Sequence, residues 1–329
     1  MSGAGPAPIT RPSGAGSAVP EGQALGDRIA ERVSQRRSQI VLGIDPDPAR
    51  LWPRALELAV EGPDGSVDRA GRAVAAHCRL LMDAAGEQCV AVKLQVACFE
   101  RLGAPGWSAL TEAVDDARER GLLVIADAKR GDIDVSARAY GQAFFGGIPG
   151  DGCPFGAIPG LGADLLTANP MLGRDSLQAL LQEARAAGGG LLALVRTSNP
   201  GAADVQDRVL AEGGSVSDVL AGLVDELGRP GIGTAGLSDV GAVTGATAPG
   251  HLQRLREAMP HAVMLLPGVG AQGASGEGLE AAFAPGRAGG LVSASRAIVY
   301  AFERHGADPA AAARDEAARL RELVWGLYA

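Results

Sequence analysis

Short apolar segments recur along the chain, and longer stretches of mixed character separate them. The apolar segments are five to seven residues long and contain many β-branched side chains. They cover residues 40–44, 89–94, 122–126, 164–168, 191–195, 240–246, 263–267 and 290–294. This length and composition are typical of strands that are buried on both faces, as in a parallel sheet.

The stretches between them show helical spacing of their apolar positions. The predicted helices cover residues 67–86, 106–120, 174–187, 205–227, 249–259 and 309–327. Alternating strands and helices imply parallel strands that are joined by crossover helices. Eight such units in about 300 residues match a (β/α)8 barrel better than a six-stranded open sheet. The sequence therefore predicts an α/β fold, a (β/α)8 TIM barrel.

Composition predicts where the barrel begins. Residues 1–23 consist mainly of Gly, Pro, Ala and Ser, which indicates a disordered N-terminal tail. Residues 24–329 contain no stretch that reads as a linker, so we expect one catalytic domain there. The segment 146–162 is rich in Gly and Pro, and we expect it to be a surface loop before the fourth strand.

Charge and composition exclude several classes of function. The net charge is −8 at pH 7, whereas a general nucleic-acid binder needs a basic face. No apolar run approaches the roughly 20 residues of a membrane span, and the N-terminus lacks the layout of a signal peptide. The four cysteines form no C-x-x-C pair, and no histidine stands at a strand end. We therefore expect a cytoplasmic protein with no metal site that binds neither nucleic acid nor membranes.

Charged residues gather where the first three predicted strands end. They are Asp45, Lys93, Asp127, Lys129 and Asp132. In barrels of this kind the active site lies at the carboxyl ends of the strands. Side chains alternate along a strand, so Asp127 and Lys129 should point the same way.

An array of alternating carboxylates and ammonium groups favours the charged form of each member. A lysine held charged between acids is a poor nucleophile, but it stabilises a developing carbanion and can donate a proton to it. The pattern thus indicates carbanion chemistry with Lys129 as the donor. The alternative is a structural ion-pair network at the rim of the barrel.

A second polar group follows the last two strands. Residues 268–273 read GVGAQG, and Arg296 follows the eighth strand. A dinucleotide-binding fold is a poor interpretation, because only one further strand follows the glycines. Alone, the segment is typical of a turn. The loops after strands seven and eight are the usual phosphate site of these barrels, so together with Arg296 it indicates a phosphate site.

Motifs at seven strand ends resemble one enzyme family. They read LGIDPDP, VKLQVACFE, DAKRGDI, ADLLTANPMLGRDSL, LVRTSNPG, LLPGVGAQG and SASRAIVYA. In this order they resemble orotidine 5′-phosphate decarboxylase, in the longer bacterial branch of that family. The resemblance runs from about residue 27 to about residue 326 and leaves out the N-terminal tail.

The resemblance implies a homodimeric carboxy-lyase that needs neither cofactor nor metal. It would convert orotidine 5′-phosphate to UMP and carbon dioxide, the last step of UMP synthesis, in active sites shared between subunits. By position, Lys129 matches the lysine that protonates C6 of the pyrimidine. Asp127 matches the carboxylate that faces the substrate carboxylate. Lys93 helps to complete the charged network, and Asp132 matches an aspartate that the partner subunit contributes.

Five further residues match substrate contacts of the family. Asp45 matches a group that completes the network and holds the ribose. Ser136 matches the hydroxyl that accompanies the aspartate from the partner subunit, and Ser198 matches the pyrimidine contact. Gln272 and Arg296 match the residues that grip the phosphate.

The chain departs from the family at two positions. It has Asp134 where members usually carry Gly or Pro, and Ser136 where they usually carry Thr. Serine keeps the hydroxyl, so we expect little loss there. Asp134 adds a negative charge near the shared site.

Two other functions are compatible with the same barrel. Magnesium-dependent sugar-phosphate decarboxylases and hexulose-phosphate synthases share D-x-K-x-x-D, but they bind the metal through an acidic residue on the second strand. This chain has Lys93 there, which argues against a metal. A catalytically silent barrel that binds a nucleotide monophosphate is the other alternative, and the intact charged cluster argues against it.

Overall fold

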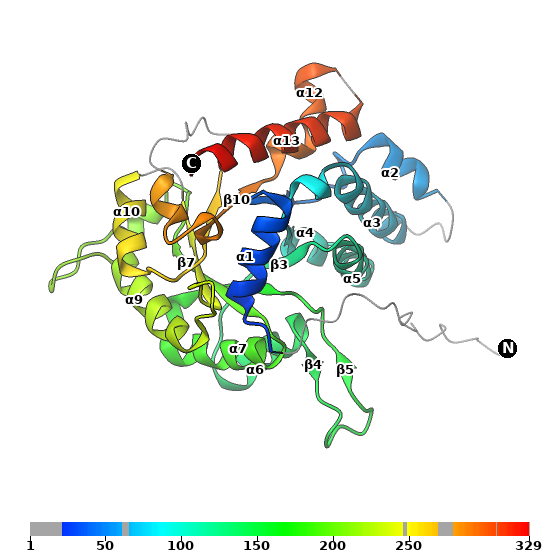
Figure 1. Ribbon diagram of the computed structural model, residues 1–329. Coiled ribbons are helices and arrows are strands. Elements are labelled where there is room, and N and C mark those ends of the chain that lie inside the picture. Colours follow the sequence, from blue (N-terminus) through cyan, green and yellow to red (C-terminus); the bar gives the residue numbers. More distant parts are fainter. Residues whose placement is uncertain (1–21, 61–65, 246–248, 269–278, 307, 329) are drawn as a thin grey trace.

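The apolar segments form the barrel that the sequence predicts. The structure, a computed structural model, describes residues 22–60, 66–245, 249–268, 279–306 and 308–328. Within these ranges eight parallel strands close into a barrel, in the order β1-β10-β9-β8-β7-β6-β3-β2 (Figure 1). They are β1 (Ile40–Ile44), β2 (Ala91–Gln95), β3 (Leu123–Arg130), β6 (Leu165–Ala168), β7 (Gly190–Arg196), β8 (Val240–Thr244), β9 (Met264–Pro267) and β10 (Gly290–Ala294). The predicted (β/α)8 fold is therefore confirmed.

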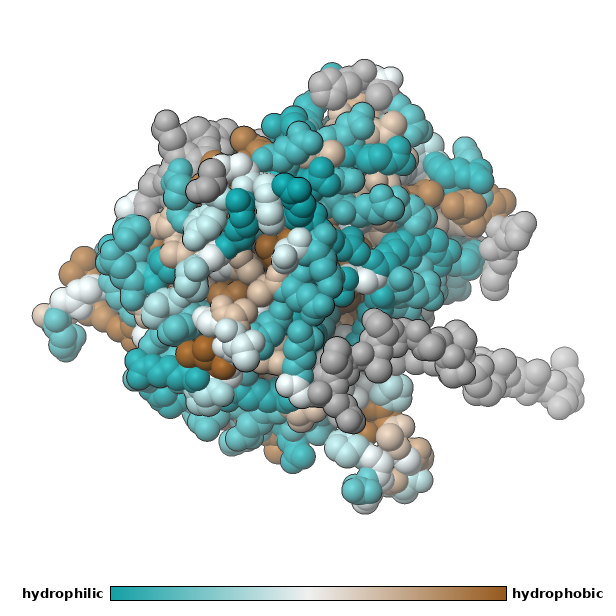
Figure 2. Space-filling view, in the orientation of Figure 1, coloured by the Kyte–Doolittle hydropathy of each residue, from teal (hydrophilic) through white to brown (hydrophobic). Residues whose placement is uncertain are grey.

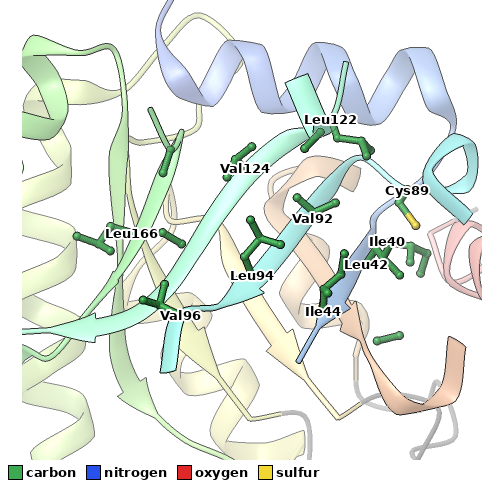
Figure 3. Close-up of a cluster of buried hydrophobic side chains, with 14 of the residues drawn as sticks. Ile40, Leu42, Ile44, Cys89, Val92, Leu94, Val96, Leu122, Val124 and Leu166 are labelled. Carbon is green, nitrogen blue, oxygen red and sulfur yellow. The ribbon is translucent and has the colours of Figure 1, made fainter. Parts of the chain in front are cut away.

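Each strand buries both of its faces. On β1, Ile40, Leu42 and Ile44 belong to the large apolar cluster between the barrel and its helices, part of which is drawn in Figure 3. Val41, between them in sequence, belongs instead to the second cluster. Each fully buried side chain of this size contributes roughly 1.5–3 kcal/mol to folding. This two-sided burial is why the strands read as unbroken apolar runs.

The longer helices cover the outside of the barrel (Figure 1). They are α3 (Ser66–Ala85), α5 (Ala104–Glu119), α6 (Asp134–Phe144), α7 (Arg174–Ala186), α9 (Val216–Gly228), α10 (Pro249–Ala258) and α13 (Pro309–Gly326). The connections contain the short α-helices α2 (Pro53–Leu58), α4 (Val96–Glu100), α8 (Ala202–Val205), α11 (Arg296–Val299) and α12 (Phe302–His305). They also contain the 3-10 turns η1 (Gly86–Gln88), η2 (Pro170–Leu172), η3 (Arg229–Gly231), η4 (Glu280–Phe283) and η5 (Arg287–Gly289). Five of the six predicted helices agree with the structure to within two residues at each end.

The prediction of one helix over 205–227 is wrong. The chain forms α8, then an irregular loop, and begins α9 only at Val216. Gly213 and Gly214 adopt positive φ angles of 89° and 75°, which a right-handed helix does not allow. Ser215 then begins α9 with a capping box, in which its side chain and that of Asp218 each bond the other's backbone N–H.

Helix α1 (Leu25–Arg36), which the sequence pattern did not predict, covers one end of the barrel. Its residues Leu25, Ile29 and Val33 are buried in one cluster with residues of the strands and their N-terminal flanks, among them Val90 and Leu165. The strands begin at this end. The opposite end, where the strands terminate, is left for polar side chains.

The segment 146–162 contains a small hairpin, where a surface loop was expected. Strands β4 (Gly147–Ile148) and β5 (Ile158–Pro159) pair antiparallel and project from the barrel between α6 and β6 (Figure 1). Gly147 has a φ of 95°, and a Cβ there would lie 2.0 Å from the carbonyl oxygen of Ile158. Only glycine permits this close pairing. Phe155, between the two strands, is 85% exposed.

The described surface is mainly hydrophilic on the face that Figure 2 shows. In Figure 2 hydrophilic side chains dominate the face that α1 crosses, and apolar residues form small separate groups. None of the described helices has both the length and the apolar character of a membrane span. The predicted N-terminal tail lies almost entirely outside the described residues.

Candidate active site

Asp127, near the end of β3, forms the centre of the predicted charged array. Its Oδ2 atom accepts a hydrogen bond from Lys93 Nζ at 2.6 Å, and its Oδ1 atom accepts one from Lys129 Nζ at 2.6 Å. Asp45 Oδ1 lies 3.9 Å from Lys93 Nζ on the other side. Because β1, β2 and β3 are neighbours in the barrel, these four side chains converge although they are far apart in sequence.

Two neutral side chains complete the surroundings of Asp127. Thr167 Oγ1, on β6, donates to Asp127 Oδ1 at 3.0 Å and accepts from the backbone N–H of Lys129 at 2.9 Å. Gln95 Nε2, on β2, donates to Asp127 Oδ2 at 3.1 Å. Sequence reasoning gave neither Thr167 nor Gln95 a role. The signal was present, since Gln95 stands two residues after Lys93 and so shares its side of the strand.

The end of β3 is not a regular strand. Lys129 has a φ of 51°, and the pairing of β3 with β6 shifts register between Ala126 and Arg130. The side chains of Asp127 and Lys129 meet as expected. The expectation was based on regular alternation of side chains along a strand, and the backbone at Lys129 does not follow that alternation. A non-glycine residue in the left-handed region is strained, and such strain is common at functional sites.

The array fixes the charge of two buried groups. Burial by itself would raise the pKa of Asp127, but the ammonium groups of Lys93 and Lys129 outweigh it and bring the pKa to about 2. Burial would lower the pKa of Lys93, but Asp127 and Asp45 outweigh this effect and raise it above its usual value. At neutral pH Asp127 is thus a carboxylate and Lys93 an ammonium.

Asp132 stands apart from the array of its own chain. Its Oδ1 atom accepts from the backbone N–H of Ile133 at 2.8 Å, and its carbonyl oxygen accepts from Ser176 Oγ at 2.5 Å. Within the described ranges no ion pair joins its carboxylate to Lys93 or Lys129. Within one chain Asp132 therefore lies outside the array, and its contribution from a partner subunit stays a prediction. Ser136, in the first turn of α6, is exposed.

The predicted phosphate site is seen only in part. Arg296 is exposed at the start of α11, and its guanidinium forms no ion pair with any described residue. β10, which precedes it, pairs with β9, which ends just before Gly268. Gln272 and the rest of the glycine segment lie outside the described residues. Ser198 follows β7 and is half-buried.

A link that sequence reasoning missed ties α11 to the loop after β1. Trp52 Nε1 donates to the carbonyl oxygen of Val299, the last residue of α11, at 3.0 Å. The backbone N–H of Trp52 donates to His77 Nδ1 at 3.2 Å. Burial lowers the pKa of His77 to about 4, so at neutral pH the ring is uncharged and able to accept. His77 therefore has a structural role, in which it holds the backbone of Trp52.

The described residues contain no group of three or more His, Cys, Asp or Glu side chains that could hold a metal ion. The position on β2 where the magnesium-dependent enzymes would need an acid holds Lys93, and it is paired with Asp127. Cys78 and Cys89 are buried, and burial raises the pKa of both thiols.

Comparison with known proteins identifies the family. The family model described as Orotidine 5′-phosphate decarboxylase / HUMPS family matches residues 38–315. A Rhodopirellula baltica protein named orotidine 5′-phosphate decarboxylase is 39% identical over 263 residues, covering 80% of this chain and 84% of that protein. A Deinococcus radiodurans protein of the same name is 38% identical over 304 residues, covering 91% and 96%. The structure of Leishmania donovani OMP decarboxylase superposes with a TM-score of 0.63 at 30% identity, covering 91% and 99%.

These matches span the barrel and every described residue of the charged array. They confirm the resemblance noted from the strand-end motifs and, with it, the enzyme class of a carboxy-lyase. The chain belongs to the orotidine 5′-phosphate decarboxylase family.

Proposed function

We propose that the protein converts orotidine 5′-phosphate to UMP and carbon dioxide, with Lys129 as the proton donor to C6. The observation that carries the proposal is the array in which Lys93 and Lys129 each lie 2.6 Å from Asp127. The names of the relatives support the choice of substrate. The array supports the mechanism, because decarboxylation of C6 leaves an electron pair on that carbon that needs a nearby cation and a proton.

The bond changes are simple. The C6–carboxylate bond breaks, carbon dioxide leaves, and its bonding electrons stay on C6. Lys129 Nζ then transfers a proton to C6, which gives UMP and a neutral amine that regains a proton from water. The side chain of Lys129 is 45% exposed, so solvent can reach it in the free protein.

Asp127 and Lys93 prepare this step. Since Asp127 is ionised at neutral pH, it holds Lys129 in place and meets the substrate carboxylate as a like charge that loss of carbon dioxide relieves. The charges are fixed before the reaction begins, so little reorganisation is needed in the transition state. Lys93 and Asp45 extend the array towards β1, where we propose that they hold the ribose.

The phosphate contributes binding energy away from the reacting carbon. We assign it to Arg296, together with Gln272 and the glycine segment. Ser198 contacts the pyrimidine in this proposal. Binding of a remote, non-reacting group helps catalysis when it orients the substrate and closes the site around it.

In this proposal a second subunit completes the active site. Each site takes Asp132 and Ser136 from the partner subunit. The proposal is supported by the lack of an ion pair between Asp132 and any described cation of its own chain. Apolar side chains beside it are also exposed: Ile133 by 50% and Val135 by 82%. On the neighbouring loop after β6, Met171 and Leu172 are 57% and 52% exposed. Exposed apolar groups around a functional site are typical of a subunit interface. The independence from cofactors and the cytoplasmic location stay predictions.

The first experiment is a turnover assay. Purified, chelator-treated protein is mixed with orotidine 5′-phosphate, and the loss of its ultraviolet absorbance is followed. We expect rapid loss without added metal. Turnover that appears only after magnesium is added would contradict the metal-free mechanism. Tight binding of UMP without turnover would instead favour the silent nucleotide-binding barrel.

A further inference from the structure

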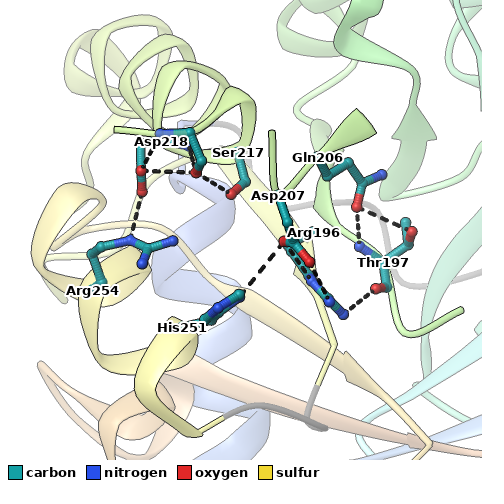
Figure 4. Close-up of polar contacts among 9 residues, drawn as sticks. Arg196, Thr197, Gln206, Asp207, Ser217, Asp218, His251 and Arg254 are labelled. Atoms are coloured by element: carbon teal, nitrogen blue, oxygen red, sulfur yellow. Dashed lines mark hydrogen bonds and ion pairs between the residues drawn. The ribbon is translucent and has the colours of Figure 1, made fainter. Parts of the chain in front are cut away.

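The two residues before Ser198, Arg196 and Thr197, are held by several hydrogen bonds. At the end of β7, the guanidinium of Arg196 binds Asp207, eleven residues later, through two hydrogen bonds (Figure 4). Nε donates to Oδ1 at 3.2 Å and Nη2 donates to Oδ2 at 2.8 Å. The remaining nitrogen, Nη1, donates to the carbonyl oxygen of Thr197 at 2.8 Å. The segment just after α8 is thereby tied back to the end of β7.

Gln206 anchors the other side of Thr197. Its Oε1 atom accepts from the backbone N–H of Thr197 at 2.7 Å (Figure 4). Its own carbonyl oxygen accepts from the backbone N–H of Ser217, in the first turn of α9, at 2.9 Å. The backbone N–H of Thr197 is thus bonded to a side chain nine residues away, and its carbonyl oxygen is bonded to the neighbouring Arg196, which Asp207 holds in turn.

The end of β8 supports Ser198 from a third direction. The backbone N–H of Gly245 donates to the carbonyl oxygen of Arg196 at 2.7 Å. A Cβ atom at Gly245 would lie only 3.0 Å from Ser198 Cα, so the two backbones are in close contact. The Ser198 hydroxyl itself has no hydrogen bond to any described residue, which leaves it available to a ligand.

We infer that Arg196, Gln206 and Asp207 are positioning residues that hold the Ser198 hydroxyl against the pyrimidine of the substrate. The inference rests on the proposed function, which gives Ser198 its contact. A hydroxyl can bond a ring only where its backbone is placed correctly, and a misplacement of 1 Å can reduce the rate by roughly 100-fold. Here the side chains of Arg196, Gln206 and Asp207 fix the backbone before Ser198. The Ser198 hydroxyl takes no part in these hydrogen bonds.

The test is a double-mutant cycle between Asp207 and Ser198, read as kcat/KM for orotidine 5′-phosphate. Asp207→Asn removes the charge that binds Arg196. We expect it to lower kcat/KM by about ten-fold in the wild-type background but by less than about two-fold in the Ser198→Ala background. Equal losses in both backgrounds, or no loss in the wild type, would overturn the inference. The matched control is Asp225→Asn, which breaks the Arg229–Asp225 pair on α9 and should leave kcat/KM unchanged.

Two substitutions of Gln206 test the positioning role independently. Gln206→Glu keeps an oxygen that can accept from Thr197, whereas Gln206→Ala does not. We expect activity close to wild type in the first variant and a loss in the second, and equal losses would count against positioning. If the wild-type protein fails to turn over the substrate, the proposed function is wrong, and the affinity of each variant for UMP then decides the inference. Thermal unfolding of each variant identifies any that do not fold.

Discussion

Lys93 Nζ and Asp127 Oδ2 lie 2.6 Å apart, and both residues are more than 90% buried. A buried ion pair gains little over an apolar pair, but the loss of one partner leaves a charge without compensation. The intact pair therefore adds little to stability, but removal of either partner should destabilise the protein.

Lys93→Ala should destabilise the protein. Asp127 would keep Lys129, Thr167 and Gln95, but it would lose the more buried of its two cations. We expect the free energy of unfolding to fall by about 3 kcal/mol, which a urea titration would measure. The control is Arg54→Ala, which breaks the exposed Arg54–Glu57 pair and should cost less than about 1 kcal/mol. Equal effects would show that burial of the Lys93 pair is not the cause.

Stability should fall in acid in a way that Asp127 controls. Its pKa is about 2 in the folded protein, below the value of roughly 3.9 in an unfolded chain. A depressed pKa adds stability that is complete above about pH 4 and is lost as the pH falls towards 2. The amount is about 2 to 3 kcal/mol. We expect a steeper fall in unfolding free energy between about pH 4 and 2 for the wild type than for Asp127→Asn, and parallel curves would contradict the assignment.

Lys129→Ala should abolish decarboxylation and leave the fold intact. The alanine keeps a Cβ, so the backbone at the bulge is no more strained than before. A retained affinity for UMP would show that the site still forms. Activity within about ten-fold of the wild type, a loss of ~1.4 kcal/mol or less in transition-state binding, would remove Lys129 from the role of proton donor.

The shared site can be tested by mixing two inactive proteins. In a heterodimer of Lys129→Ala and Asp132→Ala subunits, one site carries both changes and the other carries neither. Each heterodimer should therefore have about half of the wild-type activity, since one of its two sites is intact. The two subunits are co-produced with different affinity tags, and the doubly tagged dimer is assayed. A doubly tagged dimer without activity would exclude a site that takes Asp132 from the partner.

Sequence patterns predicted the barrel because each strand is buried on both faces and leaves an unbroken apolar run. They predicted the meeting of Lys93 with Asp127 because strand ends converge at one end of a barrel. They failed where the backbone leaves regular geometry. The positive φ angles of Lys129, Gly213 and Gly214 depend on local packing and hydrogen bonds that no periodicity encodes. The support from Thr167 was also missed, because an uncharged hydroxyl at a strand end carries no charge to mark it as part of the array.

The position of Asp134 gives the last prediction. The resemblance of the strand-end motifs suggests Gly or Pro at the position of Asp134, and the backbone at this residue fits Gly but does not fit Pro. Asp134 is exposed and has a φ of 44°, in the left-handed region. Glycine adopts this conformation freely, whereas proline is held near −65°.

We therefore expect Asp134→Gly to keep the unfolding free energy within about 1 kcal/mol of the wild type, because relief of the left-handed strain offsets the loss of an acid at the start of α6. Asp134→Pro should destabilise by more than about 1 kcal/mol, since the backbone must shift to accept it. That shift would move Ser136, two residues on, so the proline variant should also lose activity. Urea titrations of both variants check the first expectation and kcat/KM the second. A proline variant as stable and active as the glycine variant would mean that the start of α6 tolerates a right-handed backbone at this residue.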